Sequence, residues 1–273
     1  QELLRLAEKC HTVPAITSNW LGGRGNSEVV FVKYEDNQSA IMKIYPEDDK
    51  HDRLFAEFYG LQACHQVGLS QVAKPIGKDE EMSIATYEYV PGIVATRSPN
   101  PGEDIDQMIR ALATLHESRQ ESVFRKFPRA SAACLSALEL CEQVYARVTS
   151  FGHARVEFPI LDAYFDRELL PFQKRYELVA RQRWASTHDF DDLLPDDEKT
   201  LSPSDFGFHN ALRTKDRGLV FIDFEYFGWD DPAKLSADFL LHPAMMNSKK
   251  AQNRWVEGAI SVYGLSLMSR LNA

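Results

Sequence analysis

Residues 201–232 read LSPSDFGFHNALRTKDRGLVFIDFEYFGWDDP, and the interpretation of the whole chain starts from them. Asp205 is followed five residues later by Asn210, and Asp223 comes directly after the apolar run 219–222. A turn-rich segment, 214–218, separates the two halves. The pattern predicts a loop with Asp205 and Asn210, a short strand, a tight turn and a second strand that ends at Asp223.

A hairpin of this kind brings three oxygen-bearing side chains close together. Phosphoryl transfer uses such a set, with one carboxylate to orient the attacking hydroxyl and an amide and a carboxylate to hold Mg²⁺ on the phosphates. The alternative is that these Asp and Asn side chains only cap turns. Features nearer the N-terminus favour the chemical interpretation.

The composition describes an ordinary globular protein. The 273 residues are 44% hydrophobic and 26% charged, enough for one large core or two small ones. A net charge of −9 argues against a nucleic-acid or anionic-membrane partner. The four cysteines lack metal-ligand spacing, and no membrane-spanning or signal segment stands out, so we expect a reduced, cytoplasmic protein. Cys134 and Cys141, seven apart, predict stacked core positions of one helix.

The first 90 residues predict a β-rich unit. Strands at 16–21, 29–32 and 39–45 are separated by a glycine cluster, 22–27, and by a polar turn. Backbone N–H groups of a glycine-rich turn can close over phosphates, although most such turns only satisfy backbone geometry.

A lysine and a glutamate are predicted to pair in this unit. Lys43 lies in an otherwise apolar strand, and Glu57 lies in the apolar stripe of a helix predicted over 52–67. A carboxylate beside buried positions needs a cation, and Lys43 is the candidate. The alternatives are a lysine that reaches solvent and a glutamate at the solvated edge of its helix.

The segment 72–77, a turn at 78–81 and a strand at 82–90 complete a five-stranded sheet with one helix. Pro91-Gly92 marks a junction between domains 1–90 and 91–273. The second domain is predicted to be mostly helical. Its helical patterns cover 104–117, 130–148, 160–184, 232–242 and 250–271.

Taken in order, these motifs resemble the aminoglycoside phosphotransferase and choline kinase family. The resemblance covers roughly 19–243 and implies an α+β, protein-kinase-like bilobal fold, with a small β-rich N-terminal lobe holding one helix and a larger, mostly helical C-terminal lobe. It rests on the glycine loop 22–27, Lys43, Glu57, the hinge 89–92, Leu115-His116, Asp205-x4-Asn210, the segment 222–225 and Asp231-Pro232.

The resemblance implies a small-molecule kinase that transfers the γ-phosphoryl group of ATP or GTP to a hydroxyl of a metabolite or aminoglycoside-like acceptor. Asp205 is then the catalytic residue, and Asn210 and Asp223 bind Mg²⁺. The implied nucleotide-binding residues are Gly23, Gly25 and Ser27 of the loop, the phosphate-binding Lys43 with its partner Glu57, and Glu88 and Val90, whose main chain meets the adenine.

Two positions depart from the family pattern. Pro203 stands where the family usually has a histidine, and Glu28 replaces the third glycine of the protein-kinase loop. Pro203 favours the alternative of a catalytically silent, kinase-like nucleotide-binding protein with a regulatory or scaffold role. The short segment between Asp223 and Asp231 disfavours a protein kinase, because it leaves little room for a peptide platform.

The acceptor is predicted from charge. An acidic segment, 189–198, precedes the catalytic loop, and Tyr226, Trp229 and Trp184 offer aromatic faces. If these groups line the cleft, together with Glu225 and Asp231, they favour an amine-bearing acceptor. The alternative is that the acidic segment is only a solvated surface.

Overall fold

The N-terminal part of the chain forms a five-stranded antiparallel sheet in the computed structural model, which describes residues 1–22, 27–47, 50–96, 101–184, 188–243, 245 and 248–272. Its strands are β1 Ala15–Gly22, β2 Glu28–Tyr34, β3 Ser39–Ile44, β4 Pro75–Asp79 and β5 Ile84–Glu88, in the order β1-β2-β3-β5-β4. Alternate residues of β2 (Val30, Val32 and Tyr34) are buried, and helix α1, Glu2–Lys9, contributes Ala7 to the same cluster. The predicted sheet is confirmed.

The helix that carries Glu57 begins with a π-helical turn. This turn, Phe55–Tyr59, runs directly into α2, Gly60–Gln66. A side chain at Gly60 would approach the ring of Phe227 to 3.0 Å, so glycine permits close packing there. The helix belongs to the largest hydrophobic cluster, which also contains residues of α3, Pro101–Glu117, and not to the β1–β3 cluster. The predicted unit 1–90 therefore shares its helix core with the second domain, and a boundary at residue 90 stays a prediction.

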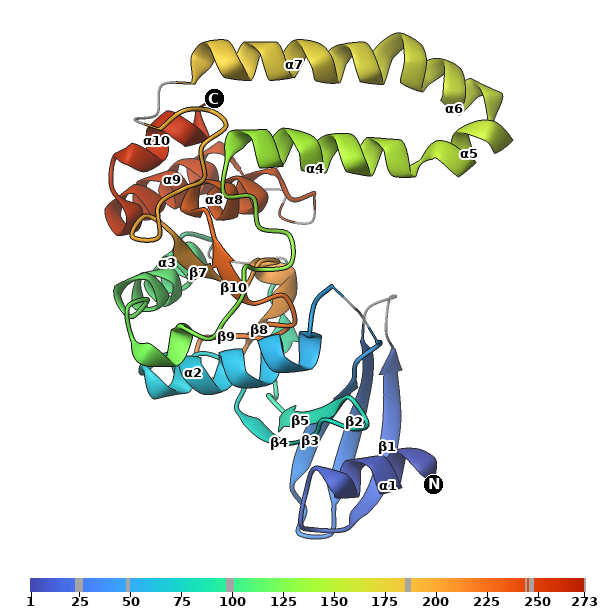
Figure 1. Cartoon of the computed structure of the whole chain (residues 1–273). Helices are drawn as coiled ribbons and strands as arrows, with labels where there is room; N and C mark the ends of the chain where they lie inside the picture. Colours follow the sequence, from blue (N-terminus) through green and yellow to red (C-terminus); the bar gives the residue numbers. More distant parts are fainter. Residues whose placement is uncertain are drawn as a thin grey trace.

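Two small sheets and three C-terminal helices complete the core around α3 (Figure 1). One sheet pairs β6 Ile93–Val94, β8 Ala211–Arg213 and β9 Leu219–Phe221, and the other pairs β7 Thr200–Ser202 with β10 Gly228–Asp230. The helices are α8 Pro232–Leu241, α9 Lys249–Tyr263 and α10 Ser266–Leu271. The single helix predicted over 250–271 is broken at Gly264, whose φ of 85° belongs to the left-handed region.

A helical arm projects from the C-terminal lobe (Figure 1). It consists of α4 Ala137–Ser150, α5 Gly152–Glu157, α6 Pro159–Tyr164, a π-helical turn Phe165–Leu169 and α7 Leu170–Arg183. The helix predicted over 130–148 starts later, because Ala130 donates its backbone N–H to the carbonyl of Trp229 in β10. Cys134 therefore lies before α4, and its predicted stacking with Cys141 on one helix was wrong.

Short helical turns link the remaining segments at Ser122–Phe124 and Phe208–Asn210. No helix among the described residues is long and apolar enough to cross a bilayer.

Candidate active site

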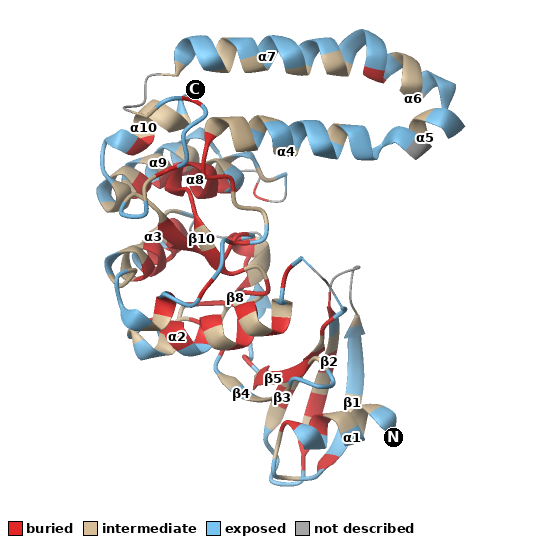
Figure 2. Cartoon of the chain, in the orientation of Figure 1, coloured by how far each residue is buried: buried red, intermediate tan, exposed pale blue. Residues whose placement is uncertain are grey.

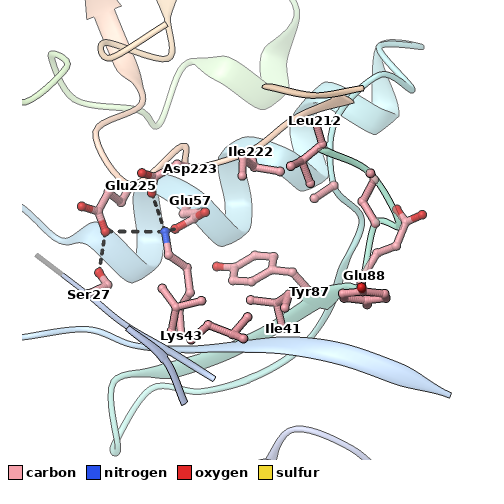
Figure 3. A pocket seen from close by; sticks show the side chains of 16 residues that line it. Ser27, Ile41, Lys43, Glu57, Tyr87, Glu88, Leu212, Ile222, Asp223 and Glu225 are labelled. Carbon is pink, nitrogen blue, oxygen red and sulfur yellow. Dashed lines mark hydrogen bonds and ion pairs between the residues drawn. The ribbon is translucent and has the colours of Figure 1, made fainter. Parts of the chain in front are cut away.

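Lys43 of β3 lies among three carboxylates, and its predicted contact with one of them, Glu57, is present. Its Nζ atom is 2.6 Å from Glu57 Oε2, 2.5 Å from Asp223 Oδ1 and 3.6 Å from Glu225 Oε2 (Figure 3). Burial alone would lower the pKa of Lys43, but the attraction of the carboxylates outweighs burial and raises the pKa. The lysine is therefore a permanently charged anchor for negative groups.

Glu57 is held by more than the lysine. Tyr45 donates its hydroxyl to Glu57 Oε2 at 2.8 Å, and the hydroxyls of Tyr45 and Tyr87 are 2.6 Å apart. Burial raises the pKa of Glu57 to about 7, while the charge of Lys43 opposes this rise. The sequence suggested the Lys43–Glu57 contact but not the two tyrosines, because their spacing in the chain carries no local signal.

Glu225 links the glycine turn to the segment that follows β9. Its side chain is buried, and its Oε2 atom accepts the hydroxyl of Ser27 at 2.5 Å. Arg53 Nη1 lies 3.5 Å from Glu225 Oε1, and its guanidinium stacks over the ring of Tyr226 at 5.2 Å. Gly23 and Gly25, the other predicted nucleotide-binding residues of this turn, lie outside the described residues.

The loop that carries Asp205 is held without a histidine at position 203. Ser202 Oγ accepts the backbone N–H of Ser204, which has a φ of 69°. His209 Nε2 lies 2.9 Å from Asp205 Oδ1, and Asn210 donates Nδ2–H groups to the carbonyl and to Oδ2 of Asp205 at 2.9 and 3.2 Å. The bond from His209 is the main cause that lowers the pKa of Asp205. A histidine four residues after Asp205 thus fixes the carboxylate of a loop in which Pro203 occupies the usual histidine position.

A second histidine supports the first. His242, just after α8, stacks its ring on that of His209, with centroids 4.5 Å apart and planes at 6°. Its Nε2 atom is 3.9 Å from Asp205 Oδ1. Sequence reasoning missed both histidines; only the four-residue spacing between Asp205 and His209 could have indicated the nearer one.

A cavity of about 450 Å³ lies between the five-stranded sheet and the β8–β9 hairpin. One part is apolar, and the part at Lys43 is charged (Figure 3). The apolar lining includes Val29, Ile41, Ala73, Val90, Leu212 and Ile222. The polar lining includes Ser27, Lys43, Glu57, Glu88, Asp223 and Glu225.

Six predicted site residues thus share one cavity, and two lie beside it. Asp205 and Asn210 are not among its lining residues, but the carbonyl of Asn210 accepts the backbone N–H of Ile222, next to Asp223. The β8–β9 pairing, with Ala211 opposite Phe221, brings the two ends of the hairpin together as predicted.

An arginine clamps the hinge edge of the cavity. Arg217, in the β8–β9 turn, donates to Glu88 Oε1 at 2.6 Å and to the carbonyls of Ser70 and Val72 at 2.8 and 3.2 Å. The other carboxylate oxygen of Glu88 accepts the backbone N–H of Lys74 at 3.1 Å. These bonds tie the end of β5 to the segment that precedes β4 and to the turn of the second lobe.

Three of the six acidic side chains of the segment 189–198 contact a basic neighbour. Asp191 pairs with Arg181, Asp196 pairs with Lys199, and Glu198 contacts His188 and Arg270. None of the residues 189–198 lines the cavity at Lys43. The segment therefore does not contribute to this cavity, and its effect on an acceptor near Asp205 stays a prediction.

Two of the three aromatic side chains predicted to meet the acceptor are already engaged. Tyr226 lies beneath Arg53, and Trp184 donates its indole N–H to the carbonyl of His188 at 2.8 Å. Trp229 lies in β10, where it pairs with Leu201 of β7.

Comparison with known sequences gives one family. The sequence model described as "Phosphotransferase enzyme family" matches residues 21–272, nearly the whole chain. No curated protein sequence matches the chain significantly.

Comparison with solved structures shows the fold. A spectinomycin phosphotransferase crystallised with ADP and spectinomycin is 16% identical, with a TM-score of 0.67, and the match covers 99% of this chain and 88% of that one. A choline kinase from Streptococcus pneumoniae is 18% identical, with a TM-score of 0.60 and coverages of 95% and 80%. A macrolide 2′-phosphotransferase from Brachybacterium faecium is 15% identical, with a TM-score of 0.60 and coverages of 99% and 87%. The chain thus has the predicted α+β, protein-kinase-like fold.

Proposed function

The chain belongs to the phosphotransferase enzyme family, and we propose from this premise that it transfers the γ-phosphoryl group of ATP or GTP to a hydroxyl of a small molecule. The observation that carries the proposal is the divided cavity, with apolar walls in one part and the Lys43 cluster in the other. A nucleotide has the same division, because its base is apolar on both faces and its phosphates are anionic.

The apolar part suits the base. Ile41 lies on one side of the cavity and Leu212 and Ile222 lie on the other (Figure 3), and such side chains can enclose a purine ring. Glu88 and Val90 line the edge where Arg217 fixes the chain. The backbone N–H of Glu88 is donated to the carbonyl of Lys74, so the base would meet the remaining main-chain groups of this rigid segment. Because both ATP and GTP present hydrogen-bonding edges, these contacts do not by themselves select adenine over guanine.

The charged part suits phosphates and a divalent cation. Three carboxylates, from Glu57, Asp223 and Glu225, offer oxygens within 4.8 Å of one another, with Lys43 among them. Hard cations such as Mg²⁺ prefer oxygen ligands, and Asp223 is the most exposed of these three carboxylates, so it is the one best placed to offer an oxygen to the ion. We assign Mg²⁺ to Asp223 and Asn210, where it would neutralise phosphate charge; Asp223 would then release Lys43 to the phosphates.

The catalytic loop suits hydroxyl activation. Asp205 is the more exposed partner of its contact with His209, and its lowered pKa keeps it ionised near neutral pH. An ionised carboxylate can accept a hydrogen bond from an acceptor hydroxyl and orient its oxygen toward the phosphorus atom. His209 and Ser202 hold the loop in place of the absent histidine, and this support for Asp205 favours an active enzyme in spite of Pro203.

The acceptor is proposed only by class. The solved structures similar to this chain include phosphotransferases for spectinomycin, choline and a macrolide, and we propose a small hydroxyl compound, with an amine-bearing one tested first. The charge of the acidic segment does not carry that choice. A cytoplasmic location and the absence of nucleic-acid and membrane partners stay predictions.

The test is a screen for ADP or GDP release by the purified chain. Hydroxyl metabolites, amino sugars and aminoglycosides are offered with ATP or GTP and Mg²⁺, and product phosphorylation is checked by mass spectrometry. We expect turnover with one acceptor class, and its loss by several orders of magnitude in Asp205→Asn with nucleotide binding retained. Nucleotide binding that needs no metal, with no acceptor phosphorylated, would favour the silent binding protein.

A further inference from the structure

The arm formed by residues 137–183 buries little surface against the part of the chain that the structure describes. Neither α4 nor α7 contains a buried residue, and most of their residues are exposed (Figures 1 and 2). Helices in globular proteins are usually stabilised by burying one face, and short helices are marginal alone in water. An arm with two unburied helices is therefore incomplete as it stands.

Apolar side chains follow the arm from its root to its tip. Leu140 and Val144 on α4 and Phe172 and Tyr176 on α7 are exposed. The members of each pair are four residues apart, so they share one face of their helix. At the tip, Val156 and Ile160 are 86% and 88% exposed. Each helix has 14 residues and is about 21 Å long at 1.5 Å per residue, longer than a small acceptor can cover. The exposed faces therefore suit another set of helices.

The charge of the arm varies along its length. Helix α7 has a net charge of +3, and the tip, residues 151–169, has a net charge of −2, with histidine taken as neutral. In α7 the basic residues are Lys174, Arg175, Arg181 and Arg183, and the acidic one is Glu177. In the tip the acidic residues are Glu157, Asp162, Asp166 and Glu168, and the basic ones are Arg155 and Arg167.

We propose that the arm is the interface of a homodimer, in which the arms of two copies pack antiparallel to each other. A two-fold axis then places the acidic tip of each copy against the basic α7 of the other, so the same surface is complementary to itself. The negative tip disfavours an anionic membrane as the partner, since such a surface attracts basic segments. The apolar stripes of α4 and α7 become the core of an intermolecular helical bundle.

The first test is the mass of the whole chain as a function of concentration, by analytical ultracentrifugation. We expect a dimer of twice 31.1 kDa for the wild type. Phe172→Glu/Tyr176→Glu places two charges in the interface and should weaken dimerisation by about a hundredfold or more, which is about 2.7 kcal/mol. Both side chains are exposed, so the melting temperature of the monomer should not fall. Met82→Glu, at an exposed apolar residue between β4 and β5, is the matched control and should dimerise normally.

A charge exchange tests the antiparallel arrangement. Lys174→Glu/Arg175→Glu should weaken the dimer, and adding Glu157→Lys/Glu168→Lys should restore it, because attraction between α7 and the opposite tip is re-established. A wild type that stays monomeric at every concentration overturns the proposal, as does an unimpaired Phe172→Glu/Tyr176→Glu dimer. Binding of the monomer to vesicles of anionic lipid would instead identify the arm as a membrane-docking element. None of these measurements depends on the proposed kinase activity.

Discussion

Replacing Lys43 by methionine should destabilise the fold strongly, because it leaves two buried carboxylates without their cation. The side chains of Glu57 and Glu225 are 3% and 2% exposed, and Lys43 lies 2.6 and 3.6 Å from them. Removing one partner of a buried ion pair typically costs about 3–5 kcal/mol. Glu225 keeps Arg53 at 3.5 Å, so Glu57 is the group left without a cation in contact.

Adding Glu57→Gln to Lys43→Met should therefore recover stability. The uncharged amide removes the unpaired buried charge, and coupling between touching residues is about 0.5–3 kcal/mol, so we expect a recovery of about 1–3 kcal/mol. Nucleotide turnover should stay lost, because the lysine is still absent. The stability and the activity of this cluster would thus be separated by a single additional substitution.

The effect should depend on pH through Glu57. Its folded-state pKa, about 7, is above its ordinary value of 4.5, so its ionisation destabilises the fold as pH rises between these values. Without Lys43 the pKa of Glu57 rises further, and the deficit of Lys43→Met grows at alkaline pH. The deficit should be larger at about pH 8 than at about pH 5.5, and Glu57→Gln should remove most of this difference.

Urea unfolding followed by tryptophan fluorescence measures these free energies. The control is Lys78→Met, which breaks the exposed Lys78–Glu80 pair and should barely change the midpoint. Strictly additive losses for Lys43→Met and Glu57→Gln, with the same deficit at both pH values, would refute the coupling inferred from the structure.

Three further predictions concern the catalytic loop, the metal and α3. Asp223→Asn should weaken Mg²⁺-dependent nucleotide binding more than Asn210→Ala, because the carboxylate supplies charge and the amide only a dipole; equal losses in isothermal titration would contradict this. His209→Ala should lower kcat by roughly ten- to a hundredfold, through loss of about 1.5–3 kcal/mol of hydrogen bonding to Asp205, while KM for ATP stays constant. Burial lowers the pKa of His116 from its ordinary value of 6.5 to about 4. The folded state is therefore fully stable with respect to this histidine above pH 6.5, and it loses stability as pH falls toward 4 because the unfolded chain binds the proton more readily. His116→Gln should reduce the decline of the melting temperature over that pH range, and an unchanged slope would exclude His116 as the cause of the decline.

Local patterns predicted the elements that hold the nucleotide cavity. Apolar runs and turns gave β1 to β5 and the β8–β9 hairpin, since both depend on alternation and on residues such as Gly218 at a φ of 69°. The contact between Lys43 and Glu57 followed from the energy of burying a lone charge. These inferences need only neighbouring residues and one physical rule.

Contacts between distant segments escaped prediction. The start of α4 was missed because backbone bonds between residues 128–130 and β10 replace helical ones. A local signal was available there, since Ser136 Oγ accepts the N–H of Glu139 at 3.0 Å in a capping pattern. Arg270, which pairs with Glu198, lies 72 residues away in the chain. The sequence composition therefore could not show that the charge of Glu198 is compensated.

Ser204 and Asp223, one on each side of the candidate chemistry, adopt left-handed backbone angles, with φ of 69° and 67°. Aspartate tolerates this region better than most residues, but serine stays there at a cost of about 1–3 kcal/mol. Ser204→Gly would release that tension and leave Asp205 on a freer backbone. Directed evolution for thermal stability alone should therefore select glycine at position 204 and yield variants with a higher melting temperature and a lower turnover rate. Screening for turnover at the same time should retain serine.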